Sequence, residues 1–154
     1  MSIETRRVAS QIRRSQEGVA WHGPSVLEAL YGVDHIKAAT HPLPAAHSIW
    51  ELVKHVTAWQ RIAALALAGG QYESMTGDAD WPPIADTSAD AWRADLAAMA
   101  EVNARLVAAV RAFPPERLDE IVAATEFNFY FLLHGIAQHN VYHAGQIALL
   151  NQAR

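Results

Sequence analysis

The chain has 154 residues, of which 51% are hydrophobic, and its 12 Lys and Arg against 16 Asp and Glu give a formal charge of −4. This length suits a single domain over residues 1–154, and the absence of cysteine excludes disulfides, thiolate metal ligands and a cysteine nucleophile. The acidic balance argues against nucleic acid as a partner. No apolar run suits a membrane span or a signal peptide, so we expect a cytoplasmic protein without a membrane partner.

The first half of the chain predicts two helices joined by an irregular connection. We expect the first helix over residues 3–20, interrupted at His22-Gly23-Pro24 and resuming to residue 30 with Pro24 in its first turn. Ser48 and Glu51 then fit a capping box, in which each residue satisfies a backbone N–H of the other. This motif predicts a second helix over residues 48–68, ended by Gly69-Gly70.

The second half predicts two more helices after a long connection over residues 69–87. Connections of this length are uncommon in compact domains and are often functional. A third helix from about residue 88 to 113 carries apolar residues at steps of three and four, interrupted by Asn103, which either sets the packing register or points at a functional site. A fourth helix follows over residues 128–151. Because no strand pattern is present, we expect an all-α four-helix bundle with long inter-helix connections.

The inner face of the fourth helix carries polar residues where apolar ones are expected. Steps of three and four along it give Phe129, Leu132, Ile136, His139, His143, Gln146 and Leu150. His139 and His143 lie about 40° apart around the helix and can chelate one ion, although histidine pairs at this spacing also occur on surfaces or make ordinary hydrogen bonds. His55 lies on the edge that Leu52 and Trp59 share, and it joins the pair only if the second and fourth helices face each other.

Other residues of the fourth helix have two interpretations or a supporting role. Gly135 and Gly145 each weaken a helix by about 1 kcal/mol relative to alanine, which predicts a close approach by a ligand or by a neighbouring helix. His134 lies about 140° around the helix from His139, so we expect it outside the same site, with a structural or supporting role.

Three stretches of the sequence are characteristic: residues 21–25 (WHGPS), 46–55 (AHSIWELVKH) and, most specifically, 134–147 (HGIAQHNVYHAGQI). On these stretches the sequence resembles the DinB/YfiT-like superfamily of small metal-binding helical bundles, and the resemblance covers nearly the whole chain. In that family one metal ligand comes from the second helix and two from the fourth, which implies His55, His139 and His143 as ligands of one divalent ion, with Zn or Ni the first choices. An acidic residue often follows the first ligand of the fourth helix in that family, and here it is Asn140, which would orient a ligand ring less strongly.

Three neutral histidines leave the charge of a divalent ion uncompensated, so such an ion lowers the pKa of bound water or of a bound thiol. Two reactions of a small-molecule substrate suit this property: hydrolysis, and transfer of a thiol such as bacillithiol, mycothiol or glutathione to an electrophile. The superfamily that the chain resembles includes thiol-dependent transferases and isomerases, which ranks thiol transfer first. The competing class is a non-enzymatic protein in which the metal is structural or the bundle serves dimerisation.

The candidate catalytic residues are Glu51 and Gln146. Glu51 is the carboxylate one turn before His55, although helix capping can occupy it fully. Gln146 shares the face of His139 and either contacts water on the metal or packs in the core. Five tryptophans and the apolar composition of a small bundle further predict a homodimer.

Overall fold

The structure, a computed structural model, describes residues 2–73 and 75–153, and its main elements are four long helices. The α-helices are α1 (Ile3–Gln16), α2 (Val26–Ala29), α3 (His35–Ala39), α4 (Ile49–Leu67), α5 (Ala89–Ala112) and α6 (Phe129–Gln152), with 3-10 turns at Gly77–Ala79 and Pro115–Arg117. In these described ranges the one β pairing is an isolated bridge between Ile121 and Asn128. The all-α helical bundle expected from the sequence is therefore confirmed.

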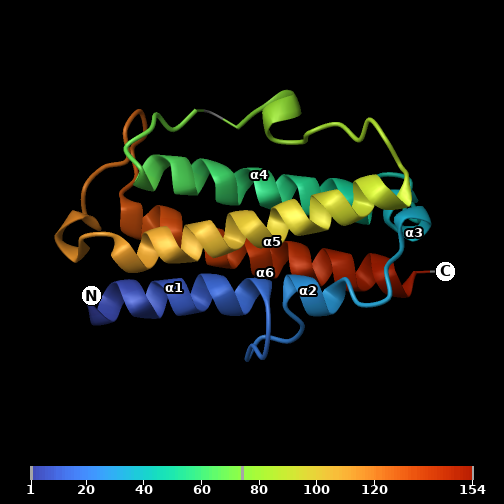
Figure 1. Cartoon of the computed structure of the whole chain (residues 1–154), viewed down its shortest axis with the longest axis horizontal. Coiled ribbons are helices and arrows are strands. Elements are labelled where there is room, and N and C mark those ends of the chain that lie inside the picture. Colours follow the sequence, from blue (N-terminus) through green and yellow to red (C-terminus); the bar gives the residue numbers. More distant parts are fainter. Residues whose placement is uncertain (1, 74, 154) are drawn as a thin grey trace.

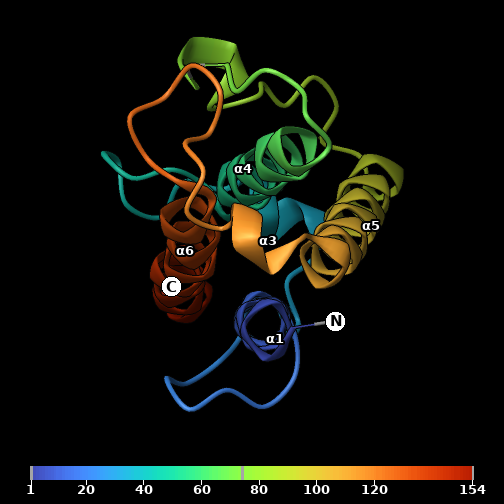
Figure 2. The same cartoon turned by 90° about the vertical axis from the view of Figure 1, so that its left-hand side faces the viewer.

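The four long helices form a ring in which each contacts two neighbours, in the order α4, α5, α1, α6 (Figure 2). Helices α1 and α6 run in one direction along the bundle, whereas α4 and α5 run in the other (Figure 1). Because α4 and α5 are parallel, the connection of residues 68–88 has to return along the bundle, and it does so across the outer side of α4 (Figure 1). This crossover lies over the helix that carries His55.

The boundaries of the last three long helices follow from their caps. Ser48 Oγ accepts the backbone N–H of Glu51, and the Glu51 carboxylate accepts the backbone N–H of Ser48, so the predicted capping box is present. Ser88 and Asn128 cap α5 and α6 in the same way from their side-chain oxygens. Gly69, with φ +84°, adopts the left-handed conformation that ends α4.

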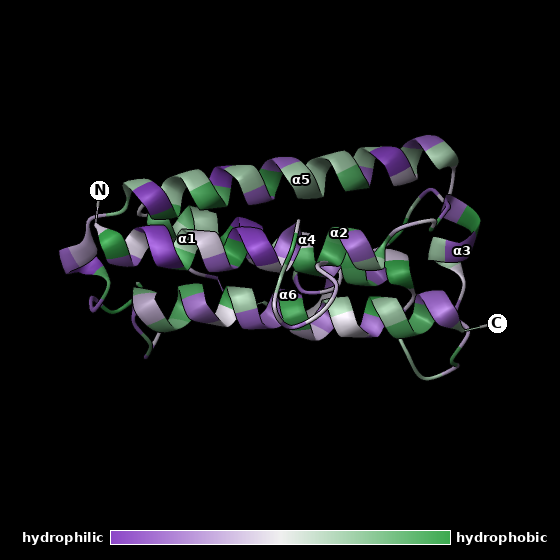
Figure 3. Ribbon diagram, turned by 90° about the horizontal axis from the view of Figure 1, so that it is seen from below, coloured by the Kyte–Doolittle hydropathy of each residue, from purple (hydrophilic) through white to green (hydrophobic). Residues whose placement is uncertain are grey.

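The first helical region differs from the sequence prediction. Helix α1 ends at Gln16 rather than at residue 20, because Glu17 is extended and Gly18 takes a left-handed φ of +78°. Residues 17–25 form a loop beside the bundle (Figure 3), and the next helix begins after Ser25, which forms a capping box with Glu28. Pro24 therefore precedes that helix instead of starting it. The short helix α3, capped by Asp34, was not predicted.

The core consists of two apolar clusters separated by buried amide and hydroxyl side chains. These polar residues, which we call the amide layer, are Ser15, Gln16, Gln60, Asn103 and Asn140, all at most 4% exposed. Gln60 Nε2 donates to Gln16 Oε1 at 2.9 Å and to Asn140 Oδ1 at 3.1 Å, and Gln60 Oε1 accepts from Asn103 Nδ2 at 3.1 Å. One side chain of α4 thus bonds to all three other long helices. Of the two roles considered for Asn103, these contacts match the one in packing register.

None of the helices in the described part of the chain combines the length and the apolar character needed to cross a membrane.

Candidate metal centre

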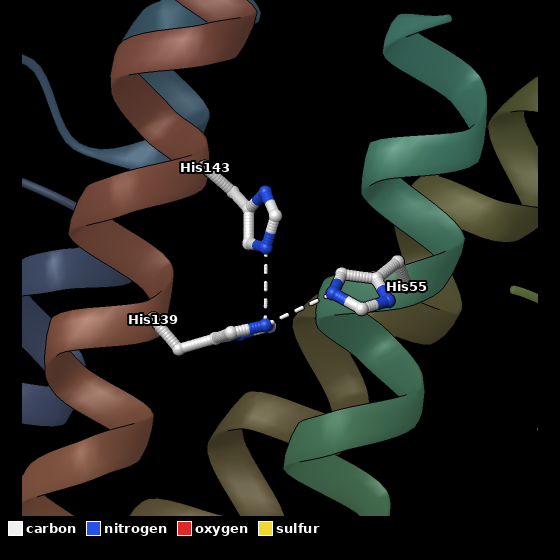
Figure 4. A group of neighbouring side chains, drawn as sticks. All are labelled: His55, His139 and His143. Atoms are coloured by element: carbon white, nitrogen blue, oxygen red, sulfur yellow. Dashed lines mark hydrogen bonds between the residues drawn. The ribbon is translucent and has the colours of Figure 1, made fainter. Parts of the chain in front are cut away.

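Three histidines from two helices converge on one point (Figure 4). Nε2 of His139 lies 3.0 Å from Nε2 of His55 and 3.0 Å from Nε2 of His143. His139 and His143 are one turn apart on α6, and His55 reaches them because α4 is the neighbour of α6 in the ring. His55 and His143 are each only 5% exposed. The three residues could hold a metal ion, with one ligand atom from each.

The hydrogen bonds of the outer ring nitrogens set the tautomers. His143 Nδ1 donates to Gln146 Oε1 at 2.6 Å, and His55 Nδ1 donates to the backbone oxygen of Asp80 at 2.8 Å. With the proton on Nδ1, both rings direct an unprotonated Nε2 at His139. A single proton on His139 Nε2 can satisfy only one of these two neighbours fully, whereas a cation accepts all three lone pairs.

The spacing also agrees with metal coordination. Nitrogens about 2.0–2.1 Å from a tetrahedral zinc ion are about 3.3 Å apart, which is close to the two 3.0 Å contacts of His139. The ligand atoms of all three residues lie within 4.8 Å of one another. The residues present therefore fit a divalent ion bound through three Nε2 atoms.

Burial keeps the three imidazoles neutral. Burial and, to a smaller extent, the neighbouring His143 and His55 lower the pKa of His139 to about 3. Burial is also the main cause that lowers the pKa of His143 to about 4, against the opposing hydrogen bond to Gln146. The pKa of His55 is lowered by burial as well, although Asp80 opposes this. Neutral imidazole is the form that binds metal, so at neutral pH the three histidines are already in the protonation state that metal binding requires.

The crossover between α4 and α5 supplies two site residues that were not predicted. Asp80 Oδ1 accepts from Trp59 Nε1 at 2.8 Å and lies 3.1 Å from Nδ1 of His55. The Trp81 ring stacks in parallel on His55 and on His47, with ring centroids 3.9 and 3.5 Å apart. The length of the connection indicated a functional segment, but an irregular segment has no periodicity that identifies which of its residues meet the site.

The predicted residue Glu51 is engaged away from the three histidines. Its carboxylate accepts the Ser48 backbone N–H and lies 3.0 Å from Nε2 of His41 and 3.5 Å from Nδ1 of His47. Burial raises the pKa of Glu51, but the hydrogen bonds from Ser48 and His41 outweigh it and hold the pKa below its ordinary value. Such a group is a weak base at neutral pH. Gln146, in contrast, contacts His143 directly and holds its ring.

The structure also bears on the predictions made for Asn140 and for the two glycines of α6. Asn140 is fully buried and bonds Gln60 and Ser15, so its amide takes part in the amide layer instead of orienting His139. Beyond its own helix turn, a Cβ added at Gly135 or Gly145 would meet no atom within 4 Å, so the predicted close approach of a neighbouring helix is wrong, and a close approach by a ligand stays a prediction.

Two cavities border α6, and Tyr142 lines both of them. The larger, about 860 Å³, lies between α1, the loop of residues 17–25 and α6, and His134 lines it, whereas none of the three converging histidines does. His134 packs against Tyr130 and stands outside the centre, as expected. The second cavity, about 480 Å³, is bordered by His143 and Gln146 and lies next to the candidate metal centre.

The fold and the site together define a helical bundle with a possible three-histidine metal centre. The sequence pattern of the DinB superfamily matches residues 23–147, and the chain belongs to this superfamily. The matched range includes all three histidines. No curated protein and no solved structure matches the chain.

Proposed function

We propose that the protein is a metal-dependent enzyme that transfers a small-molecule thiol to an electrophilic substrate. The observation that carries the proposal is the convergence of three neutral imidazole Nε2 atoms beside a cavity of about 480 Å³. Among the described residues, no fourth His, Asp or Glu joins this group. Structural zinc sites normally use four protein ligands, so a three-ligand set favours a reactive centre.

Each residue of the centre has a distinct role in this proposal. His55, His139 and His143 would hold one divalent ion, Zn or Ni, since imidazole suits both. Bound on neutral ligands, such an ion lowers the pKa of a thiol or of water. Asp80 and Gln146 fix the rings of His55 and His143 through their Nδ1 atoms. Trp81, stacked on His55, covers one face of the site against water.

The thiol has to come from a separate molecule, because the chain has no cysteine. Bacillithiol, mycothiol and glutathione are the candidates. The three-histidine ligand set and the membership of the DinB superfamily support thiol transfer, and the same centre acting on water is the alternative that the experiment distinguishes.

The test compares thiols and substrates on metal-loaded protein. We expect conjugation of monochlorobimane to require both metal and one of the three thiols. His143→Ala should abolish the metal-dependent part, and His134→Ala, on the same helix but outside the centre, should preserve it. Ester turnover without thiol that rises with pH near about 7 would instead indicate a hydrolase. With metal bound, an absence of turnover with every combination would favour a non-enzymatic role.

A further inference from the structure

We propose that the cavity beside His143 binds the uncharged, apolar body of the electrophilic substrate, whose reactive end faces the three histidines. That the bound molecule is a substrate rests on the proposed function, but the ligand preference of the cavity can be measured without turnover. The expected ligand is a compound with one polar end that can bind a metal ion and a neutral aromatic or branched aliphatic remainder.

The lining of the cavity is mainly hydrophobic. Its larger apolar and aromatic members are Leu43, Leu52, Trp81, Tyr142, Leu149 and Leu150. Alanines and the polar side chains His47, His143 and Gln146 complete the lining, and none of the described residues that line the cavity is Asp, Glu, Lys or Arg. Pockets with apolar walls and a few polar groups at one end are typical small-molecule sites.

Polar atoms of His143, Gln146 and His47 in the lining already have partners. His143 Nδ1 donates to Gln146, and the His47 ring stacks on Trp81 with its Nδ1 3.5 Å from the Glu51 carboxylate. The charged residues of the first turns of α4 are also engaged: Glu51 caps the helix, and Lys54 Nζ lies 3.9 Å from Asp95. In the part of the cavity away from the three histidines, a charged ligand group would therefore lose hydration without gaining a counterion, which is unfavourable.

The size of the cavity sets the size of the ligand. A dry apolar cavity of about 150 Å³ holds one benzene ring, so about 480 Å³ suits a body of two or three rings or a comparable aliphatic group. Leu149 and Leu43 are 62% and 44% exposed, and a ligand in the cavity would cover leucine surface that now contacts water. A thiol that carries free carboxylates has to keep them outside this cavity, so the cavity is assigned to the electrophile.

The first experiment measures the affinities of three metal-binding probes for cobalt-loaded protein by visible absorption. We expect benzohydroxamic acid to bind about ten-fold or more tightly than acetohydroxamic acid, which lacks the apolar body, and than 4-carboxybenzohydroxamic acid, which adds a charge. Leu149→Lys should reduce the difference in affinity between benzohydroxamic acid and 4-carboxybenzohydroxamic acid, and Leu149→Glu should increase it. The control Leu65→Lys changes a similarly exposed leucine of α4 that does not line this cavity, and it should leave all three affinities unchanged.

A second experiment tests the cavity without a contribution from bound metal. In His139→Ala protein, the neutral dye N-phenyl-1-naphthylamine should bind more tightly than the anionic dye 1-anilinonaphthalene-8-sulfonate. The double variant with Leu149→Glu should bind the neutral dye less tightly than His139→Ala alone. The proposal is overturned if both dyes bind equally or if Leu149→Lys behaves as Leu65→Lys. A retained preference for neutral aromatic probes without any thiol transfer would overturn the proposed function and leave the cavity assignment in place.

Discussion

Asp80 presents two acceptors to one ring nitrogen of His55: its backbone oxygen lies 2.8 Å and its carboxylate Oδ1 3.1 Å from Nδ1. A metal-binding histidine whose second nitrogen donates to a carboxylate or carbonyl is fixed in tautomer and orientation. Asp80 comes from the crossover between α4 and α5, so this segment contributes to the centre although it provides none of the three converging imidazoles.

Removing the Asp80 carboxylate should weaken metal binding while the fold persists. We expect Asp80→Ala to lower the affinity for zinc by about 10–100-fold, because the ring of His55 loses its charged acceptor and keeps only the backbone oxygen. Competition with a chromophoric chelator measures the affinity. Asp78→Ala, an exposed aspartate of the same crossover, is the matched control and should leave it unchanged. Equal affinities for the two variants would show that the carboxylate has no part in the centre.

The three imidazoles should account for the metal content of the protein. Elemental analysis of purified protein is expected to give about one divalent ion per chain, and His139→Ala should reduce the affinity by orders of magnitude, since two imidazoles remain. His134→Ala, five residues earlier on α6 and outside the centre, should retain the ion. If the alanine variants of His55, His139 and His143 all keep the wild-type metal content, the ligand set is wrong.

The metal-free protein should lose stability as the pH falls. The pKa of His139 is about 3 and that of His143 about 4 in the folded state, against about 6.5 for an unfolded histidine. Protons therefore bind the unfolded chain preferentially, and the free energy of unfolding should fall as the pH drops below about 6.5, by at most about 1.4 kcal/mol per pH unit for each histidine. Urea unfolding at pH 7 and pH 5 measures this. His139→Ala should show a smaller fall than wild type, and an equal fall would assign the pH dependence to other groups.

Gly145 lies inside α6 with space for a side chain. Gly145→Ala should raise the free energy of unfolding by about 0.5–1 kcal/mol, because alanine restricts the unfolded chain and its Cβ meets no atom within 4 Å. Thermal or urea unfolding provides the measurement. The contrasting variant Gly69→Ala should destabilise the protein, since Gly69 has a left-handed φ of +84°. A destabilised Gly145→Ala variant would contradict the open space beside this glycine.

The elements that the sequence predicts correctly are those with a local physical cause. The capping box of Ser48 and Glu51 depends on two residues three positions apart, and α4 begins where it indicates. The starts predicted near residues 88 and 128 coincide with the caps that Ser88 and Asn128 form. The early end of α1 depends on a left-handed Gly18, which periodicity does not reveal.

The candidate site divides in the same way. The pairing of His139 with His143 follows from helical spacing alone, whereas the approach of His55 depends on which helices are neighbours, and the resemblance to a family supplied that information. The contact between Asp80 and His55 joins an irregular segment to a helix, and no local pattern encodes it. The homodimer stays a prediction.

The amide layer has a consequence for which substitutions around the site leave its geometry intact. A bundle packed through alanine, valine and leucine alone tolerates sliding of one helix past another by a turn, about 5.4 Å, which would separate His55 from His139. Gln60 resists such slippage, because a shift of α4 breaks its bonds to three helices at once, and a shift of any other long helix breaks one of them. The alignment of the imidazoles is thereby enforced by side chains that lie outside the centre. Exchange of the leucines around the neighbouring cavity for other apolar residues would leave these bonds intact, and with them the geometry of the three histidines.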